Sequence, residues 1–507
     1  MLQVNIFFKK SKPLIQNMKY IFFFLFLLIT SQTAFSQSFT LDFDLKKSYP
    51  DPYVFTDSSS LTTYFVFIRQ ETFVEKASIC IVETDSSFRI LRKSETECPK
   101  WHDEIVFQEI NSKHLILYIA DYQATYQPEL IKLQIDRETL TYYFDRVANI
   151  NFGDSYGYQR GLSDGKTHYI INLVHTAKSD SLIVLKIENG ISKGLQRYLL
   201  PNLKDINETW RDIFKGNRAF RRPHPMLIIN PRDVPKLALG VSENKLYLIE
   251  NQLIFSIKCG DEVTYTERII AIDCQKETVS KRDVFFPKPK ALEHYSSNDP
   301  NATASLIFEN YLFQAWTNGE TGVLAVKTMD LLKEIRRWEY TTQDTFGFKN
   351  SPIMTNNGSF WFGEKKKPFK EGTELLGKMF NDGFLLNARK NGKIIELQFG
   401  TYKYVDESVK RVALAAGFGL IGTLIGTVSF QDYERATYFW MSLNHDDLSP
   451  QKGAILPHHF DIFCEKTAAI PNVYITNHFI VNDHRAILYR KEAESNIRRY
   501  YVKVAPN

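Results

Sequence analysis

The feature that most constrains this chain is a β-hairpin signal that returns at nearly constant spacing. Each unit is an apolar, β-rich run, a polar turn and a second strand. Turn centres lie near residues 85, 137, 190, 276, 330, 391, 446 and 493. Six of the seven intervals cluster around fifty residues, and the interval from 190 to 276 is 86. Because few segments show helical periodicity, the sequence predicts an all-β fold built from repeats.

This spacing matches a four-stranded propeller blade, since four short strands and their turns use ~40–50 residues. One blade cannot cover both faces of its own sheet, and stacking blades radially buries those faces. We therefore predict a single β-propeller of seven to eight four-stranded blades over residues 37–507. An insertion at 204–225 accounts for the long interval. The alternative is two smaller β domains that meet near this insertion.

The two ends of the chain both carry strand-forming residues. Further strands are expected about twenty residues before the turns, at 113–120, 168–174, 245–250 and 311–316. The stretch 39–43 is expected to complete the blade formed by 486–489 and 500–504. Such pairing would close the ring by joining the two ends of the chain.

The N-terminus has the pattern of a secretory leader. Four lysines precede an apolar run at 20–29, which is too short to span a bilayer, and a small, polar stretch follows. We expect cleavage before Gln37. Met18 is an alternative start, because the residues ahead of it are superfluous to such a leader. The protein is then exported, to a bacterial periplasm, the outer membrane surface or the medium.

Charge and cysteine content exclude some classes of function. The formal charge of +5 falls to about +1 once the four leader lysines are removed, which argues against a nucleic-acid surface. Five cysteines leave at least one unpaired. Their spacing matches no zinc motif. Cys80 with Cys98 and Cys259 with Cys274 are candidate disulfides, and the alternative is that they are small buried apolar residues.

A glycine-rich segment at 412–430 contains no charged residue. Its 417–422 stretch matches the dinucleotide fingerprint, but the alternating strands and helices that this motif needs are missing, so no cofactor is expected. A membrane helix with close glycine packing is a second interpretation. We favour a buried strand pair or a helix packed on the propeller, because a membrane span here would break the ring.

The stretch Tyr49-Pro50-Asp51-Pro52-Tyr53-Val54 resembles the opening of the five-bladed propeller glycosidases that act on arabinan and xylan. The resemblance implies that Asp51 is a general base, and Asp154 lies near the place of a second carboxylate. The place of the acid glutamate, however, reads Arg221-Arg222-Pro223. An arginine cannot protonate a leaving oxygen, and the number of turns exceeds the five that such a propeller would have. Both observations disfavour an active glycosidase. The alternative is that Asp51-Pro52 is an ordinary turn.

Two other clusters of residues are considered as binding sites, one for a glycan and one for a metal ion. The basic and aromatic residues Trp210, Arg218, Arg221 and Arg222 are a candidate lip for an anionic glycan, with a solvated insertion as the alternative. His458 and His459 with Asp461 do not predict a metal site, because adjacent histidines on a strand point to opposite faces.

These observations favour a propeller of the kind found in bacterial envelopes, without catalytic activity, that binds a protein or a glycan. The alternatives are a carbohydrate-active enzyme that uses Asp51 and an envelope component anchored through 412–430. No cofactor, metal or nucleic acid is expected.

Overall fold

The computed structural model describes most of residues 38–507. The described residues are 38–46, 52–57, 59–70, 76–99, 105–121, 129–147, 159–163, 167–175, 179–188, 191–203, 205, 209–215, 226–229, 240, 243–259, 266–292, 302–343, 346–357, 367–368, 372–405, 433–453, 473–481, 484–491 and 497–504. The expected leader at 1–36 and the glycine-rich segment at 412–430 lie outside them.

The described residues form an all-β structure of seven sheets, most of them four-stranded antiparallel meanders. The first sheet contains β2 (Tyr53–Asp57), β3 (Thr62–Gln70), β4 (Lys76–Thr84) and β5 (Ile90–Pro99). The second contains β6 (Ile105–Ile110), β7 (His114–Asp121), β8 (Glu129–Asp136) and β9 (Tyr142–Arg146). The third contains β10 (Gln159–Ser163), β11 (Thr167–His175), β12 (Asp180–Glu188) and β13 (Ile191–Leu199).

The fourth and fifth sheets continue this pattern. The fourth contains β14 (Leu227–Ile229), β15 (Asn244–Ile249), β16 (Gln252–Cys259), β17 (Thr266–Asp273) and β18 (Thr278–Phe285), of which β14 and β15 are parallel. The fifth contains β19 (Ala302–Phe308), β20 (Tyr311–Thr317), β21 (Thr321–Thr328) and β22 (Glu334–Thr341). Between them lies the short helix η3 (Lys290–Leu292).

The sixth sheet departs from sequential order. It contains β23 (Met354–Asn357), β24 (Lys367–Pro368), β25 (Phe384–Asn391), β26 (Ile394–Val405) and β27 (Tyr433–Asn444), arranged β24-β23-β27-β26-β25. Helix α4 (Gly372–Asp382) precedes β25 and contacts β26. The turns expected near 391 and 446 both belong to this sheet, which is why eight turns correspond to seven sheets.

The seventh sheet joins the two ends of the described chain. Its order is β28 (Val473–Val481), β29 (His484–Lys491), β30 (Ile497–Val504) and then β1 (Ser38–Lys46). The antiparallel register pairs Phe39 with Val502 and Leu41 with Tyr500. The expectation that the N-terminal strand completes the C-terminal sheet is therefore confirmed.

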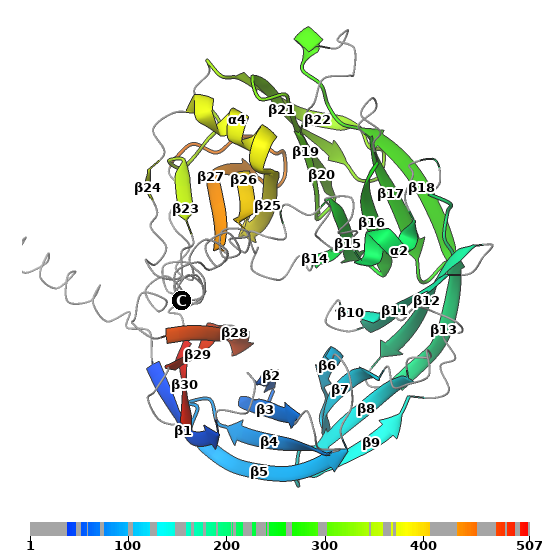
Figure 1. The fold of residues 1–507 in the computed structure, drawn as a ribbon, viewed down its shortest axis with the longest axis vertical. Coiled ribbons are helices and arrows are strands. Elements are labelled where there is room, and N and C mark those ends of the chain that lie inside the picture. The colour runs from blue at the N-terminus through cyan, green and yellow to red at the C-terminus, as the bar shows by residue number, and fades with distance from the viewer. Residues whose placement is uncertain are drawn as a thin grey trace, which may run out of the picture.

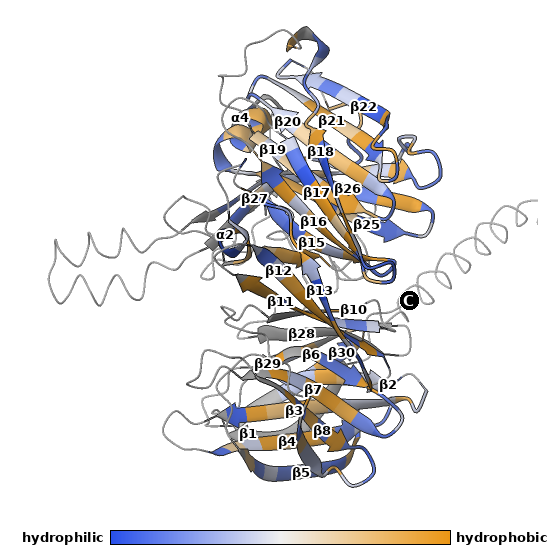
Figure 2. Cartoon of the chain, turned by 90° about the vertical axis from the view of Figure 1, so that its right-hand side faces the viewer, coloured by the Kyte–Doolittle hydropathy of each residue, from blue (hydrophilic) through white to orange (hydrophobic). Residues whose placement is uncertain are grey.

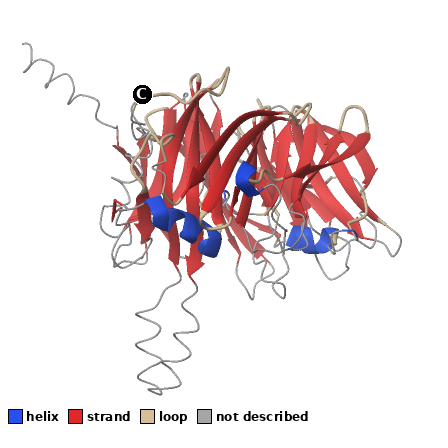
Figure 3. Cartoon of the chain, turned by 90° about the horizontal axis from the view of Figure 1, so that it is seen from above, coloured by secondary structure: helices blue, strands red, loops and turns tan. Residues whose placement is uncertain are grey.

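The sheets follow one another around the middle of the molecule in chain order, with β2, β6 and β10 on the inside and β5, β9 and β13 on the outside (Figure 1). Their strands run between two opposite faces, so the turns gather on those faces (Figure 3). Middle strands such as β4 are buried almost throughout, whereas the outer strands β13 and β18 are largely exposed. Figure 2 shows the matching concentration of apolar residues along the middle strands.

The core lies between neighbouring sheets rather than within one of them. Val66 and Ile79 of the first sheet, for example, share an apolar cluster with Leu117 and Leu133 of the second. The strands expected at 113–120, 168–174, 245–250 and 311–316 are present as β7, β11, β15 and β20. Sheet-to-sheet packing of this kind explains why the middle strands carry continuous apolar runs.

The four described cysteines carry free thiols and are buried. Cys80 lies opposite Glu95 rather than Cys98 in the β4–β5 ladder. Neither of the two candidate disulfides is present. Burial raises the pKa of the Cys80 thiol to about 11 and that of Cys98 to about 12. These cysteines are therefore small apolar core residues, the alternative given by the sequence. Within the described residues, no helix is long and apolar enough to cross a membrane.

Candidate functional site

Most of the candidate site residues lie outside the described residues. They are Asp51, Asp154, Arg218, Arg221, Arg222, His458, His459 and Asp461. Trp210 begins the helix α2 (Trp210–Lys215) and is only 1% exposed. Its indole N–H donates to the carbonyl oxygen of Pro201 at 2.9 Å, and its ring packs edge-on against Phe255. The Trp210 indole is thus a core group of this part of the fold.

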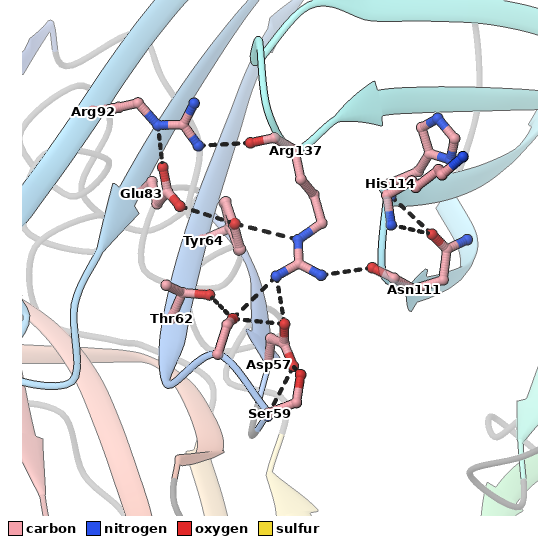
Figure 4. A network of polar contacts seen from close by, with 11 residues as sticks. Asp57, Ser59, Thr62, Tyr64, Glu83, Arg92, Asn111, His114 and Arg137 are labelled. Atoms are coloured by element: carbon pink, nitrogen blue, oxygen red, sulfur yellow. Dashed lines mark hydrogen bonds and ion pairs between the residues drawn. The ribbon is translucent and has the colours of Figure 1, made fainter.

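Arg137 forms a polar link between the first two sheets (Figure 4). It lies in the turn after β8, and its guanidinium donates to the Asp57 carboxylate and, at 2.7 Å, to the carbonyl oxygen of Asn111. The guanidinium also lies over the Tyr64 ring, 5.4 Å from its centroid. Hydrogen bonds from Ser59, Ser60 and Arg137 outweigh burial and hold the pKa of Asp57 well below its usual range. This link fixes the relative position of two sheets.

A hydroxyl, an imidazole and a carboxylate meet between the second and third sheets. Ser163 Oγ lies 2.8 Å from His168 Nδ1, and His168 Nε2 lies 3.4 Å from Glu109 Oε2. Tyr118 donates to Glu109 at 3.4 Å. Burial raises the pKa of Glu109. Because Glu109 belongs to β6 and the other two side chains to β10 and β11, the group links the second sheet to the third.

A buried polar network lies between the fourth and fifth sheets. The ammonium of Lys245 donates to the carbonyl oxygen of Ser305. Glu267 accepts hydrogen bonds from Ser256 and, at 2.8 Å, from Gln314. Burial lowers the pKa of Lys245 to about 8, against the opposing attraction of Glu267. Each of these polar groups has partners, as burial in a low dielectric demands.

At one end of the same interface the two sheets leave a cleft with a volume of about 390 Å³. It opens where the hairpins β15–β16, β17–β18 and β19–β20 turn, together with the β21–β22 turn. The floor is apolar and consists of Ile249, Ile254, Ile269, Ala271, Met329 and Leu332. The rim is charged and includes Glu250, Asp273, Lys276, Arg282, Glu309 and Asp330. We call this space the 4/5 cleft.

Two hairpins place glutamates on the rim of the 4/5 cleft. Glu250 follows β15 with φ 47°, and Glu309 follows β19 with φ 52°. Both values lie in the left-handed region, which glycine, asparagine and aspartate adopt more readily than glutamate. The neighbouring Asn251 has φ 65° and accepts a hydrogen bond from Tyr169 of the third sheet at 2.8 Å. Both glutamates thus occupy turn positions whose backbone conformation favours glycine, asparagine or aspartate.

The carboxylate of Glu309 is paired with two side chains of the sixth sheet, Lys390 and His445. Lys390 Nζ lies 2.8 Å from Glu309 Oε1, and the imidazole of His445 bonds to the other oxygen. His445 Nδ1 in turn lies 3.2 Å from Asp446. The hydrogen bonds from Lys390 and His445 outweigh burial and lower the pKa of Glu309. The cleft rim is thereby tied to a third sheet.

The comparisons with known proteins establish no family. No protein-family model and no curated protein matches the sequence. Among solved structures, the chain is similar to cobalt-substituted apocarotenoid oxygenase of Synechocystis, at 8% identity and a TM-score of 0.28 over 57% of this chain and 61% of that chain. It is also similar to S. cerevisiae core factor, at 8% identity and a TM-score of 0.32 over 93% of this chain and 62% of that one.

These matches span about three fifths of the other proteins' chains. Superpositions with such low TM-scores carry no inference about fold or chemistry.

The residues of the 4/5 cleft were not among the candidates predicted from the sequence. The sequence does contain one signal for them. The dipeptides Glu250-Asn251 and Glu309-Asn310 lie between strands, where glutamate is an unusual turn residue. Nothing local could show that the two turns lie on neighbouring sheets and line one cleft.

Proposed function

We propose that this chain is an exported, seven-bladed β-propeller without catalytic activity that binds a protein partner through the 4/5 cleft. The propeller part is supported by seven sheets that follow one another in chain order around a common middle, with β1 completing the last of them. The binding part is supported by one observation, the cleft of about 390 Å³ with an apolar floor and a charged rim.

The composition of the cleft favours a peptide segment over a sugar. Among the residues that the structure describes, no aromatic side chain lines the cleft. Sugar recognition commonly depends on stacking against Tyr or Trp, whereas aliphatic pockets with polar rims suit protein side chains. A glycan is therefore the second candidate, and the same experiment decides between them.

The test compares two variants of adjacent residues on β18. Ser280 lines the cleft and is exposed, so Ser280→Trp would fill the cleft without disturbing the core. Val279 is 37% exposed and does not line the cleft, so Val279→Trp is the matched control. We expect the mature protein to bind members of a peptide array, Ser280→Trp to lose this binding, and Val279→Trp to retain it.

Other outcomes would contradict the proposal. Binding to a glycan array that Ser280→Trp abolishes would replace the protein partner with a sugar. Binding that both variants retain would place the site elsewhere.

Export is tested separately. N-terminal sequencing of protein purified from the periplasm or the medium should give a sequence that begins at Gln37.

A further inference from the structure

We propose that the 4/5 cleft receives a lysine or arginine side chain of the partner protein, with its aliphatic part on the apolar floor and its cationic group beside Glu250. This inference rests on the proposed binding function. It is carried by the shape of the cleft and by the distribution of charge on its rim.

The rim of the cleft is acidic in balance. Four carboxylates (Glu250, Asp273, Glu309 and Asp330) and two cations (Lys276 and Arg282) line the cleft, and Lys390 beside Glu309 adds a third cation, which leaves a net charge of −1. A negative cleft with low-dielectric walls attracts cations and repels carboxylates. The charge complementarity therefore favours a basic ligand.

The two cations of the rim are already engaged. Lys276 Nζ lies 3.5 Å from Asp273 Oδ2. Arg282 donates to the carbonyl oxygen of Asp330 on the opposite wall, at 2.5 Å. Arg282 thus spans from β18 to the turn after β21. Among the described residues, neither cation forms an ion pair with Glu250 or Glu309.

The carboxylates of the rim differ in whether they already have hydrogen-bond or ion-pair partners. Asp273 accepts hydrogen bonds from the backbone N–H groups of Gln275 and Lys276, both at 2.9 Å. Glu309 is paired with Lys390 and His445. Within the part of the chain that the structure describes, Glu250 has no ion pair or hydrogen bond of its side chain. The Asp330 carboxylate accepts a hydrogen bond from the backbone N–H of Leu331 at 2.7 Å. Glu250 is therefore the rim carboxylate that remains for a cation from outside.

The floor determines which kind of cation fits. Ile249, Met329 and Leu332 line the cleft and are only partly buried, so they offer aliphatic surface to a ligand. The methylene stems of lysine and arginine bury well on such surfaces while their charged ends stay near water. A small inorganic cation would gain nothing from this floor, and an acidic or purely apolar side chain would gain nothing from Glu250.

The test uses a fragment with the chemistry of a lysine side chain. Binding of hexylammonium to the mature protein is measured by saturation-transfer NMR, with hexanol and hexanoate as matched probes. We expect hexylammonium to bind more tightly than hexanol and hexanoate not to bind. Ser280→Trp should abolish the signal, whereas Val279→Trp should preserve it.

A second pair of variants tests the role of Glu250. Glu250→Gln should weaken hexylammonium binding by about 1.5-fold to fivefold, the usual range for an exposed charge pair. Glu277→Gln is the control, because Glu277 lies in the neighbouring β17–β18 turn and does not line the cleft. The affinity should fall as salt is raised, since exposed charges are screened. Unfolding midpoints equal to wild type show that each variant is folded.

The failure of this inference can be told from failure of the proposed function. If array peptides bind in the cleft but hexylammonium does not, or if Glu250→Gln binds like wild type, the cationic ligand is wrong while the binding function stands. If neither peptides nor hexylammonium respond to Ser280→Trp, both proposals fail.

Discussion

Two glycines near the sixth sheet differ in what a methyl group would meet. A Cβ on Gly400, in the middle of β26, would overlap the carbonyl oxygen of Thr437 on β27, whereas a Cβ on Gly377 of helix α4 would meet open space. We expect Gly400→Ala to lower the free energy of unfolding by about 1–3 kcal/mol. Gly377→Ala should raise it by up to ~1 kcal/mol, since alanine favours the helix. Urea denaturation measures both, and an unchanged Gly400→Ala would contradict the β26–β27 register.

The buried Lys245 predicts an unusual dependence of stability on pH. Its pKa is about 8 in the folded protein and near 10.5 when unfolded. Between these values the unfolded state binds more protons, so the stability of the wild type rises as the pH rises from 8 to 10.5. Relative to Lys245→Met, the wild type should gain up to ~3 kcal/mol across this window. Denaturation at pH 7 and 10 measures the gain. Lys333 is exposed, so the wild type should show no such gain relative to Lys333→Met. If the stabilities of the wild type and of Lys245→Met change in parallel with pH, the lowered pKa of Lys245 is wrong.

Among the elements, the contact between the first two sheets depends on one side chain from a turn. Arg137 and Asp57 are only 12% and 13% exposed, so Arg137→Ala leaves a buried carboxylate unpaired. We expect the free energy of unfolding to fall by about 3–5 kcal/mol at pH 7. The pKa of Asp57 is depressed, so this contribution is present above the ordinary value of 3.8 and is lost as the pH falls below it.

Chemical denaturation at pH 7 and at pH 3 measures this loss, and the difference between wild type and Arg137→Ala should be smaller at pH 3. Arg89→Ala is the control, because the Arg89 side chain is 81% exposed and its removal should cost less than ~0.5 kcal/mol. A loss that does not change with pH would mean that Arg137 acts through its packing on Tyr64 and not through the Asp57 carboxylate.

The elements that the sequence predicted well are those set by local chemistry. The turn at Asp136 is an example, because its carboxylate caps the backbone N–H groups of Glu138 and Thr139 within one hairpin. The order of the sixth sheet could not be predicted, since β23 pairs with β27 across about eighty residues. The same limit applies to the 4/5 cleft, whose two glutamates come from different sheets. Arg137 likewise reaches Asp57 across eighty positions of the chain.

At the scale of the whole molecule, no strand pairing joins one of the seven sheets to another within the described residues. From the first sheet to the sixth, and between the seventh sheet and the first, neighbours share apolar clusters. Polar links such as those of Arg137, Lys245 and Glu309 add to this packing. The seventh sheet also contains a strand from the other end of the sequence, because β1 is hydrogen-bonded to β30.

This arrangement predicts that β1 can be supplied from outside the chain. A chain that starts at Lys47 lacks a strand paired with β30 at six positions, and it should lose at least ~2 kcal/mol, because each backbone hydrogen bond contributes ~1 kcal/mol. A synthetic peptide of Ser38–Lys46 should restore the unfolding midpoint in a concentration-dependent manner, since it binds the folded state alone. A scrambled peptide of the same composition is the control. If the shortened chain is as stable as the full chain, or if both peptides act alike, then the pairing of the two ends does not hold the molecule together.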